Sequence, residues 1–384
     1  MQRENKPQID LTLISIIICL AIFSLIAIYS GSGQYIDNGD LLHFVKRQAI
    51  WYVIGLLFMA AVASFDYELL KRSSYILYAA GVVLLLFVHF FGTSDNGSQR
   101  WINVGFTEVQ PSEFMKLFLI LALASVLSKI GSERLGFKAS IPAVLKALGL
   151  ALVPFVLIIK QPDLGTSLII AVIAAVLIFT SSISLKIIAA MFAGAVSLAG
   201  GFLYMYKEHL DILSKVLEPH QIGRIYGWLN TDESGSGFGF QLKQARMGIG
   251  SGQLTGEGFD QGTQVQSGLV PEVHTDFIFT VVGEEFGFIG SSLLLCLFFL
   301  MIYRIILIAI KAQDLFGVYI CVGVVGLLTF QIFQNIAMTI GIMPITGLAL
   351  PFMSYGGSSL LTNMLALGLV FSVQLHSRQY MFSE

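Results

Sequence analysis

Long apolar stretches recur along the whole chain and are separated by short polar segments. A membrane-spanning helix needs about 20 mostly apolar residues. The chain contains several stretches of about this length. We predict spans at residues 10–30, 48–65, 73–91, 112–130, 141–160, 166–182, 186–205, 275–303, 315–341 and 356–376. The pattern therefore predicts an all-α, polytopic integral membrane protein with about ten transmembrane helices, forming one membrane domain over residues 1–384.

Composition supports a membrane environment for these helices. Hydrophobic residues make up 55% of the 384 residues, charged residues make up 12%, and the mean hydropathy is +0.80. Soluble domains carry about 25% charged residues, and a single soluble core stops growing at about 250–300 residues. These figures exclude a soluble enzyme, a disordered chain and a nucleic-acid binder with a basic surface.

Basic residues are distributed unequally between the two sides that the spans define. An even number of spans puts both termini on one side, and cytoplasmic loops carry an excess of Lys and Arg. The side with the termini holds Arg3, Lys6, Lys71, Arg72, Lys129, Arg134, Lys138, Lys186, Arg304, Lys311 and Arg378. The short loops of the other side hold Lys46, Arg47, Arg100 and Lys160. We therefore expect both termini in the cytoplasm.

One segment departs from the apolar pattern. Residues 206–274 contain 13 charged positions and 12 of the 38 glycines, and the topology places them outside the cytoplasm. Long loops in compact domains are usually functional when they are not linkers, although a flexible surface loop is the alternative. We predict a large extracytoplasmic loop between the seventh and eighth spans. The apolar side chains that could pack it against the membrane domain are Trp228, Phe238, Phe240, Met247 and Ile249.

Polar residues gather at the outer ends of the spans, where the first group surrounds the start of the fourth span. Arg100 and Trp101 precede it, and Glu113 and Lys116 lie in its first turns. Glu113 and Lys116 are three residues apart, so they share one helix face and can pair. Such a pair either locks two helices together or lines a polar cavity.

The second group opens the sixth span with the sequence Gln161-Pro162-Asp163. Asp163 is placed to cap the helix, since an acid at a helix N-terminus accepts backbone hydrogen bonds and is stabilised by the helix dipole. It is equally placed to belong to a site. The two roles are compatible.

The third group lies where the long loop meets the eighth span, at residues 271–277. Asp276 is expected in the first turn of a continuous helix, where capping is the plain interpretation. Glu272, His274 and Glu284 crowd further titratable groups around it, and such crowding tunes a general base. His274 is better interpreted as a hydrogen-bonding neighbour than as a catalyst.

The fourth group combines Asn335 with the glycine-rich and hydroxyl-rich stretches 341–347 and 354–359, which include Ser358. Small residues permit tight turns and close backbone approach, although the same residues could serve only to pack two helices. The basic residues that accompany the acids on this side are Arg100, Lys116, Lys160, Arg224, Lys243 and Arg246. A carboxylate among cationic groups suits a phosphoryl or pyrophosphoryl substrate.

Together these motifs resemble the SEDS (shape, elongation, division and sporulation) family of membrane glycosyltransferases that polymerise peptidoglycan. The resemblance extends from Arg100 to Ser359, about two thirds of the chain. It is most specific at residues 271–279, at the Glu-Glu-Phe-Gly sequence 284–287 and at residues 335–359. The sequence Gly262-Thr263-Gln264 is more similar to the elongation member of the family than to the division member, and sporulation paralogues share most of the pattern.

The resemblance implies polymerisation of lipid II at the extracytoplasmic side of a bacterial inner (plasma) membrane. The family's catalytic aspartate corresponds to Asp276, which would act as general base on the acceptor sugar's 4-hydroxyl. Undecaprenyl pyrophosphate would leave, and the α-linked donor would become a β-1,4 bond. The residues implied for the lipid II and pyrophosphate cavity are Arg100, Trp101, Glu113, Lys116, Asp163, Arg224, Arg246, His274 and Ser358.

The resemblance also implies partners. Family members work beside a class B penicillin-binding protein, which supplies transpeptidation, within the elongation or division machinery; membrane lipid is a further partner and nucleic acid is not. A divalent cation (Mg²⁺ or Mn²⁺) could assist pyrophosphate departure, although no spacing in this chain is typical of a metal site. The competing hypotheses are a lipid II flippase, which needs charges along the whole crossing, and a scaffold, which needs no catalytic carboxylate.

Overall fold

Ten long helices form the membrane domain of the computed structural model, which describes residues 9–33, 42–95, 98–103, 105, 108–208, 219–231 and 237–377. They are α1 (Leu11–Gly31), α2 (His43–Ser64), α3 (Tyr67–Phe91), α4 (Pro111–Leu127), α5 (Phe137–Ile159), α6 (Leu164–Thr180), α7 (Leu185–Glu208), α13 (Gly287–Lys311), α14 (Leu315–Thr339) and α15 (Gly357–His376). Each overlaps a predicted span, which confirms the polytopic all-α fold. Eight are long and apolar enough to cross a membrane, while α4 and α6 have 17 residues each.

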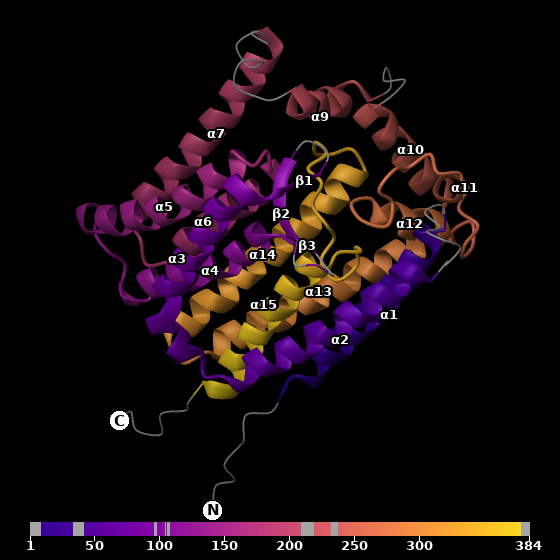
Figure 1. Ribbon diagram of the computed structural model, residues 1–384. Coiled ribbons are helices and arrows are strands. Elements are labelled where there is room, and N and C mark those ends of the chain that lie inside the picture. The colour runs from indigo at the N-terminus through magenta and orange to yellow at the C-terminus, as the bar shows by residue number, and fades with distance from the viewer. Residues whose placement is uncertain are drawn as a thin grey trace, which may run out of the picture.

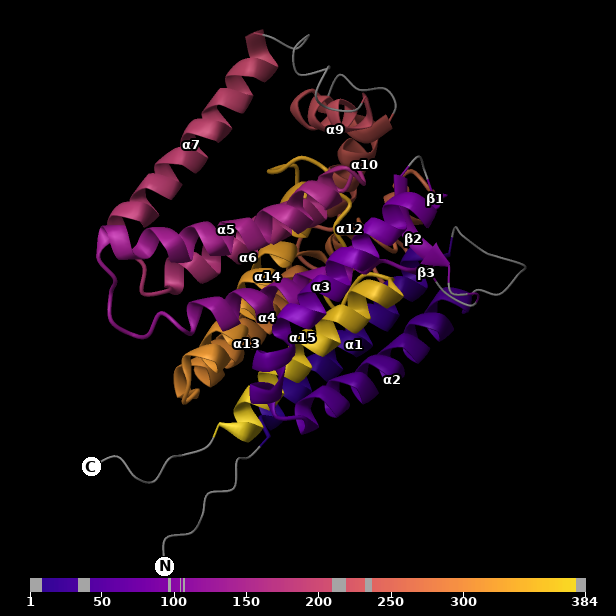
Figure 2. The ribbon, with the colours of Figure 1, turned by 60° about the vertical axis from the view of Figure 1, so that its left-hand side comes forward.

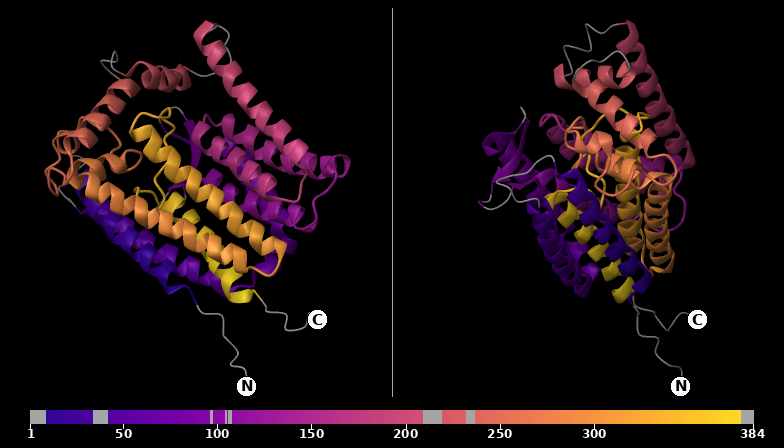
Figure 3. Two further views of the ribbon diagram at one scale, coloured as in Figure 1. Left: turned by 180° about the vertical axis from the view of Figure 1, so that it is seen from behind. Right: turned by 90° about the vertical axis from the view of Figure 1, so that its right-hand side faces the viewer.

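The bundle has two chemically different ends. We call the end where α1 begins and α15 ends the terminal end, and the opposite end, where α1 ends and α15 begins, the site end (Figure 1). Views from behind and from the side show the same arrangement (Figure 3). At the terminal end Arg304 Nε donates to Asp10 Oδ2 at 2.7 Å, and the Tyr67 hydroxyl donates to Asp314. Arg3, Lys6 and Arg378, three of the basic residues predicted on the side of the termini, lie outside the described residues.

Small residues allow the central helices to pack closely. A Cβ built on Gly368 of α15 would lie 2.9 Å from the backbone oxygen of Met59 in α2, and one built on Gly55 of α2 would lie 2.8 Å from Met364 Cγ in α15. Gly323 of α14 packs in the same way against Ile120 of α4. Membrane helices associate through such close contacts, because the lipid around them is as apolar as their side chains.

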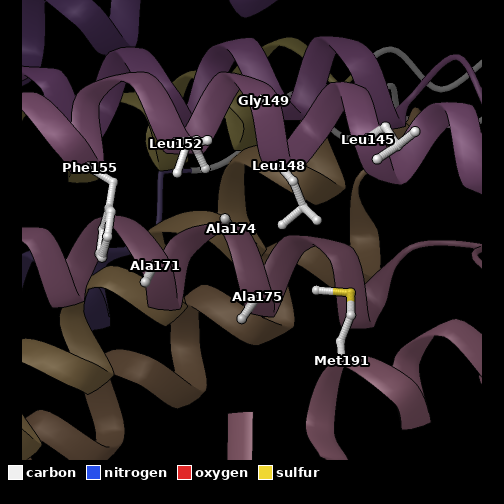
Figure 4. A pocket seen from close by; sticks show the side chains of 10 residues that line it. Leu145, Leu148, Gly149, Leu152, Phe155, Ala171, Ala174, Ala175 and Met191 are labelled. Carbon is white, nitrogen blue, oxygen red and sulfur yellow. The ribbon is translucent and has the colours of Figure 1, made fainter. Parts of the chain in front are cut away.

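Helix α7 stands apart from this core. It starts beside α5 and leans away from the bundle toward the site end (Figure 2). A groove of about 520 Å³ remains between α5, α6 and α7. Its wall is almost wholly apolar and includes Leu148, Leu152 and Phe155 from α5, Ala171 from α6 and Met191 from α7 (Figure 4).

Short elements that the apolar pattern does not reveal cover the site end. Between α3 and α4 the chain forms an antiparallel three-stranded sheet of β1 (Thr93–Asp95), β2 (Ser98–Asn103) and β3 (Glu108–Val109), with β2 in the middle. The predicted large loop contains α9 (Pro219–Leu229), α10 (Gly237–Ser251) and α11 (Thr263–Gln266). Parts of this loop, residues 209–218 and 232–236, lie outside the described residues.

The described part of this loop is anchored to the membrane domain. Trp228 Nε1 donates to the backbone oxygen of Gly341 at 2.9 Å. Trp228, Phe238 and Ile249 pack against the hydrophobic core, as predicted. Phe240 is partly buried and Met247 is 50% exposed, so the prediction was wrong for Met247.

The predicted eighth span is not one continuous helix. It is divided at Phe286 into α12 (Ile278–Glu285) and α13. The segment 252–258 makes the break possible, because it supplies partners for the backbone groups of both helix ends. Glu257 N and Gly258 N donate to the backbone oxygens of Glu284 and Glu285 at 2.9 and 3.2 Å.

On the α13 side of the break, Phe288 N and Ile289 N donate to the backbone oxygens of Gln253 and Leu254 at 2.9 and 3.1 Å. Gly287 has φ +60°, and a Cβ there would lie 2.4 Å from Gly256 N. Only glycine tolerates both the backbone angle and the close approach without strain.

Replacing Gly256 with alanine should loosen this break. Gly256 has φ +85°, and a Cβ there would lie 2.0 Å from the backbone oxygen of Glu285. We expect Gly256→Ala to lower the free energy of unfolding by about 2 kcal/mol or more, measured by thermal unfolding in detergent. The matched control is Gly250→Ala in α10, where a Cβ meets nothing within 4 Å. Equal stability of the two variants would contradict this account of the break.

Candidate functional site

Asp276 lies in a turn that precedes α12, two residues before the helix begins at Ile278. The expectation that it occupies the first turn of the helix was therefore wrong. The turn begins at Glu272, whose φ of +55° reverses the chain, and Phe277 N closes it by donating to the backbone oxygen of Glu272 at 3.2 Å. Asp276 is thus presented by a tight turn rather than used as a helix cap.

A buried amide of α14 fixes this turn. The Asn335 side chain is fully buried, and its Nδ2 donates to the backbone oxygens of Asp276 at 2.8 Å and of Leu348 at 2.7 Å. One side chain therefore joins the Asp276 turn to the connection between α14 and α15. Asn335 was noted in the sequence but was not chosen as a site residue. The signal was an amide within an apolar span, where a buried polar group needs hydrogen-bond partners.

Arg224 of α9 faces Asp276 across Gly347. A Cβ built on Gly347 would lie 3.1 Å from Asp276 Oδ2 and 3.6 Å from both terminal nitrogens of Arg224. Arg224 Nη1 donates to the backbone oxygen of Thr346 at 2.9 Å, and its guanidinium lies 5.3 Å from the centre of the Phe238 ring. The described part of the long loop thus brings a cation to the carboxylate.

Arg100 and Asp163 form the next part of the site. Arg100, on β2, donates from Nε to the backbone oxygen of Gln161 at 2.8 Å and from Nη2 to that of Pro162. Its Nη1 lies 4.0 Å from Asp163 Oδ1. Asp163 Oδ1 also accepts from Thr166 N at 3.1 Å, so this residue caps α6 and holds Arg100 at the same time. The predicted cap is confirmed, and the same carboxylate lies beside Arg100.

Arg100, Asp163 and Arg224 lie close enough to Asp276 for their charges to affect its carboxyl group. We call these four residues the Asp276 cluster. Asp276 lies outside the membrane-spanning helices, and the pKa of its carboxyl group is raised from 3.8 to about 6, with burial as the largest cause. The negative charges of Glu272 and Asp163 contribute to this rise, while the positive charges of Arg224 and Arg100 oppose it. The group is therefore ionised at neutral pH yet is a stronger base than an ordinary aspartate.

Glu113 and Lys116 form a separate ion pair in α4. Lys116 Nζ lies 2.8 Å from both carboxylate oxygens of Glu113, which confirms the predicted pairing. Lys116 is fully buried and Glu113 is 5% exposed. The pair is therefore enclosed among the helices, and each charge compensates the other where an isolated one would be costly.

His274 and Ser358, two further predicted site residues, also lie at the site end. His274 is buried, with its ring 4.7 Å from Phe44 and 5.8 Å from Tyr355 between centres, and burial lowers its pKa. Ser358 accepts from Gln110 N at 3.2 Å and donates to the backbone oxygen of Glu108 at 3.3 Å, so it joins α15 to the sheet and to the start of α4.

Trp101 and Arg246 are both accessible to solvent. Trp101 is partly exposed on β2, and Arg246 is exposed on α10, beside Gly341. In the part of the chain that the structure describes, no three His, Cys, Asp or Glu side chains are grouped to hold a metal ion.

The chain matches one known protein family along almost its whole length. The profile of the cell cycle protein family of FtsW, RodA and SpoVE matches residues 10–379. The chain belongs to this family. It is the SEDS family that the sequence motifs indicate, so that resemblance is confirmed.

Members of the family match along nearly their whole length. Stage V sporulation protein E of Bacillus subtilis is 38% identical, over 97% of this chain and 99% of that protein. The peptidoglycan glycosyltransferase MrdB of Escherichia coli is 34% identical, over 97% of this chain and 95% of that protein.

Solved structures of the family share the fold. A chain of a peptidoglycan synthase complex, described as coordinating polymerization and crosslinking, matches with TM-score 0.77 and 28% identity over 95% of this chain and 97% of that chain. The rod shape determining protein RodA of Thermus thermophilus matches with TM-score 0.69 and 27% identity over 97% of this chain and 98% of that chain.

Asp276→Asn should change how stability depends on pH. Between the ordinary pKa of 3.8 and the folded value of about 6, the folded protein holds a proton that the unfolded chain has lost. Stability of the unsubstituted protein therefore falls as pH rises through this range. We expect the Asn variant to gain stability relative to it from about pH 4 to about pH 6 and to keep that gain at higher pH, measured by thermal unfolding. A difference that does not vary with pH would contradict the raised pKa.

Proposed function

We propose that this chain is a peptidoglycan glycosyltransferase that polymerises lipid II into β-1,4-linked glycan strands and releases undecaprenyl pyrophosphate. The observation that carries the proposal is the partly buried Asp276 carboxylate, of raised pKa and close to Arg224, at the site end. Family membership supports it, because the relative MrdB is named a peptidoglycan glycosyltransferase.

In the proposed reaction Asp276 takes a proton. The 4-hydroxyl oxygen of the acceptor GlcNAc attacks C1 of the donor MurNAc and forms the new glycosidic bond. The bond from C1 to the pyrophosphate oxygen breaks, so the α-linked donor becomes a β-linked product. The hydroxyl proton passes to the Asp276 carboxylate, whose pKa of about 6 suits a base that works near neutral pH.

The arginines of the Asp276 cluster would stabilise the charge that develops on the leaving pyrophosphate. Guanidinium groups bind phosphate oxygens through paired, charge-assisted hydrogen bonds. Asp163, which holds Arg100, would orient that cation. We assign Trp101 and Arg246, both accessible to an incoming ligand, to contacts with the sugar and peptide portions of lipid II.

The other predicted residues receive supporting roles in this proposal. His274 packs beside the Asp276 turn, and Ser358 fixes the sheet that carries Arg100. Glu113 and Lys116 are enclosed and paired, so we assign them to holding the helices rather than to contact with pyrophosphate. The described residues include no group of three His, Cys, Asp or Glu side chains, so a Mg²⁺ or Mn²⁺ ion would bind mainly through the pyrophosphate of the substrate.

The distribution of basic residues supports an extracytoplasmic site. The terminal end carries Lys71, Arg72, Lys129, Arg134, Lys138, Lys186, Arg304 and Lys311 at or near helix ends. Because cytoplasmic loops are enriched in Lys and Arg, we place the terminal end in the cytoplasm and the Asp276 cluster outside it, in a bacterial inner membrane. The apolar groove between α5, α6 and α7 would take part of the undecaprenyl chain.

A class B penicillin-binding protein is the proposed partner. The similar solved chain belongs to a complex described as coordinating polymerization and crosslinking, and crosslinking needs a transpeptidase. We further propose a role in cell elongation and cell shape. The Gly262-Thr263-Gln264 sequence and the structural likeness to a rod shape determining protein support that role.

Polymerisation should depend on the Asp276 carboxylate. We expect purified protein, with its partner, to convert fluorescent lipid II into glycan that a muramidase digests. Asp276→Asn and Asp276→Ala should lower the rate by roughly a hundredfold to ten-thousandfold, because the acceptor proton then has no base.

The matched control for this experiment is Asp260→Asn. Asp260 is an exposed carboxylate at the same end of the bundle, and its Oδ1 accepts a hydrogen bond from Gln266 that asparagine can also accept. This variant should polymerise normally. Normal polymerisation by folded Asp276→Ala would contradict the assignment of the base. Transport of lipid II across vesicles without any polymer from the unsubstituted protein would instead favour a flippase.

Filling the apolar groove should weaken substrate binding. Ala171 lines the groove and is exposed in it, so Ala171→Phe should raise KM for lipid II several-fold while kcat changes little, since only uniform binding is lost. Leu198→Phe on α7 is the control, because Leu198 is 77% exposed and does not line the groove. Equal KM values for both variants would contradict the placement of the lipid chain.

A further inference from the structure

Two lysines and a tyrosine converge at the terminal end, far from the Asp276 cluster. Lys129 follows α4, Lys146 belongs to α5 and Tyr75 belongs to α3. Both ammonium nitrogens lie 5.7 Å from the centre of the Tyr75 ring. The Tyr75 hydroxyl oxygen is buried and has no hydrogen-bond partner in the described part of the chain. Two positive charges and an unused hydroxyl therefore lie around one ring.

The position of Lys146 makes this arrangement unusual. It is the tenth residue of α5, a helix long and apolar enough to cross a membrane, and its side chain is exposed. A charged group at that depth is costly unless it reaches an interface or finds a partner. Contact with the face of an aromatic ring compensates only part of that cost.

Two other cations of the membrane domain have carboxylate partners within the chain. Lys116 is paired with Glu113, and Arg304 is paired with Asp10. Over the residues that the structure describes, neither Lys129 nor Lys146 has a carboxylate oxygen within 4.0 Å. Arg72 lies one turn before Tyr75 on the same face of α3 and adds a third positive charge. The described part of the chain therefore places no carboxylate within 4.0 Å of the two lysine ammonium groups.

We propose that Tyr75, Lys129 and Lys146 bind the phosphate group of an anionic phospholipid. The two ammonium groups would lie on either side of the phosphate, and the Tyr75 hydroxyl would donate a hydrogen bond to one of its oxygens. Basic pockets between transmembrane helices on the cytoplasmic side are typical binding sites for such headgroups.

The surroundings favour a lipid over a soluble phosphate ester. Ile76, the neighbour of Tyr75 on α3, is 72% exposed, and Leu145, the neighbour of Lys146 on α5, is 64% exposed. These apolar side chains offer a surface for acyl chains next to the charged group. A ligand that reaches Lys146 within its membrane-spanning helix must itself enter the apolar layer. Leu145 also lines the apolar groove between α5, α6 and α7, so the acyl-chain surface adjoins that groove. The charged group itself lies at the opposite end of the bundle from Asp276 and does not depend on the proposed reaction.

Native mass spectrometry of the detergent-purified full chain tests this site. With phosphatidylglycerol and phosphatidylcholine as competing probes, we expect a preferred phosphatidylglycerol adduct. Lys146→Gln or Lys129→Gln should weaken that adduct about fivefold each. Lys146→Arg, which keeps the charge, should retain it. Lys186→Gln, which removes an exposed lysine elsewhere at the terminal end, is the matched control and should bind as the unsubstituted protein does.

Tyr75→Phe keeps the ring and removes only the hydroxyl, so it should weaken phosphatidylglycerol binding while the protein stays folded. Two results would overturn the proposal. One is an equal loss of phosphatidylglycerol in Lys186→Gln and Lys146→Gln, which indicates nonspecific attraction. The other is displacement of the lipid by inorganic phosphate at a similar concentration, which indicates a site for a soluble anion.

Discussion

The site depends on the break between α12 and α13, where the backbone groups of both helix ends must find hydrogen-bond partners. A helix cannot be interrupted beside hydrocarbon unless other parts of the chain supply the lost partners. Here the segment 252–258 supplies them to both helix ends. Two carboxylates of α12 also anchor this helix to its neighbours. Glu284 accepts hydrogen bonds from Gln264 N at 2.6 Å and Val265 N at 3.0 Å, and Glu285 accepts one from the Ser30 hydroxyl. The short helix that follows the Asp276 turn is thereby fixed to its surroundings.

Charges in the bundle follow a second constraint, because each must be compensated or kept near an interface. The pair of Glu113 and Lys116 satisfies it locally, within one helix. The Asp276 cluster satisfies it over long distances, with residues from β2, the start of α6, α9 and the turn before α12. Two cations and two anions balance in that cluster. A pyrophosphate that enters it would find arginines already held by backbone carbonyls of Gln161, Pro162 and Thr346.

The sequence predicts the local part of this structure well. The membrane spans are predicted by the length of the apolar stretches. The pairing of Glu113 with Lys116 is predicted by their i, i+3 spacing, and the helix cap at Asp163 by its position before a helix. The break at Phe286 could not be predicted, because its cause is a segment about 30 residues earlier in the chain. The approach of Arg224 to Asp276 was likewise hidden, since only the folding of α9 over the α14–α15 connection brings them together.

In the proposed reaction, Asp276 is a base whose pKa is raised by burial, while Arg224 opposes that rise. The most direct test is the pH dependence of kcat/KM for lipid II polymerisation by the purified protein with its partner. The account predicts an acidic limb with an apparent pKa of about 6, and a shift of that limb to higher pH in Arg224→Gln, because the cation that favours the carboxylate is then lost. An acidic limb near pH 4, or one that Arg224→Gln leaves in place, would contradict the account.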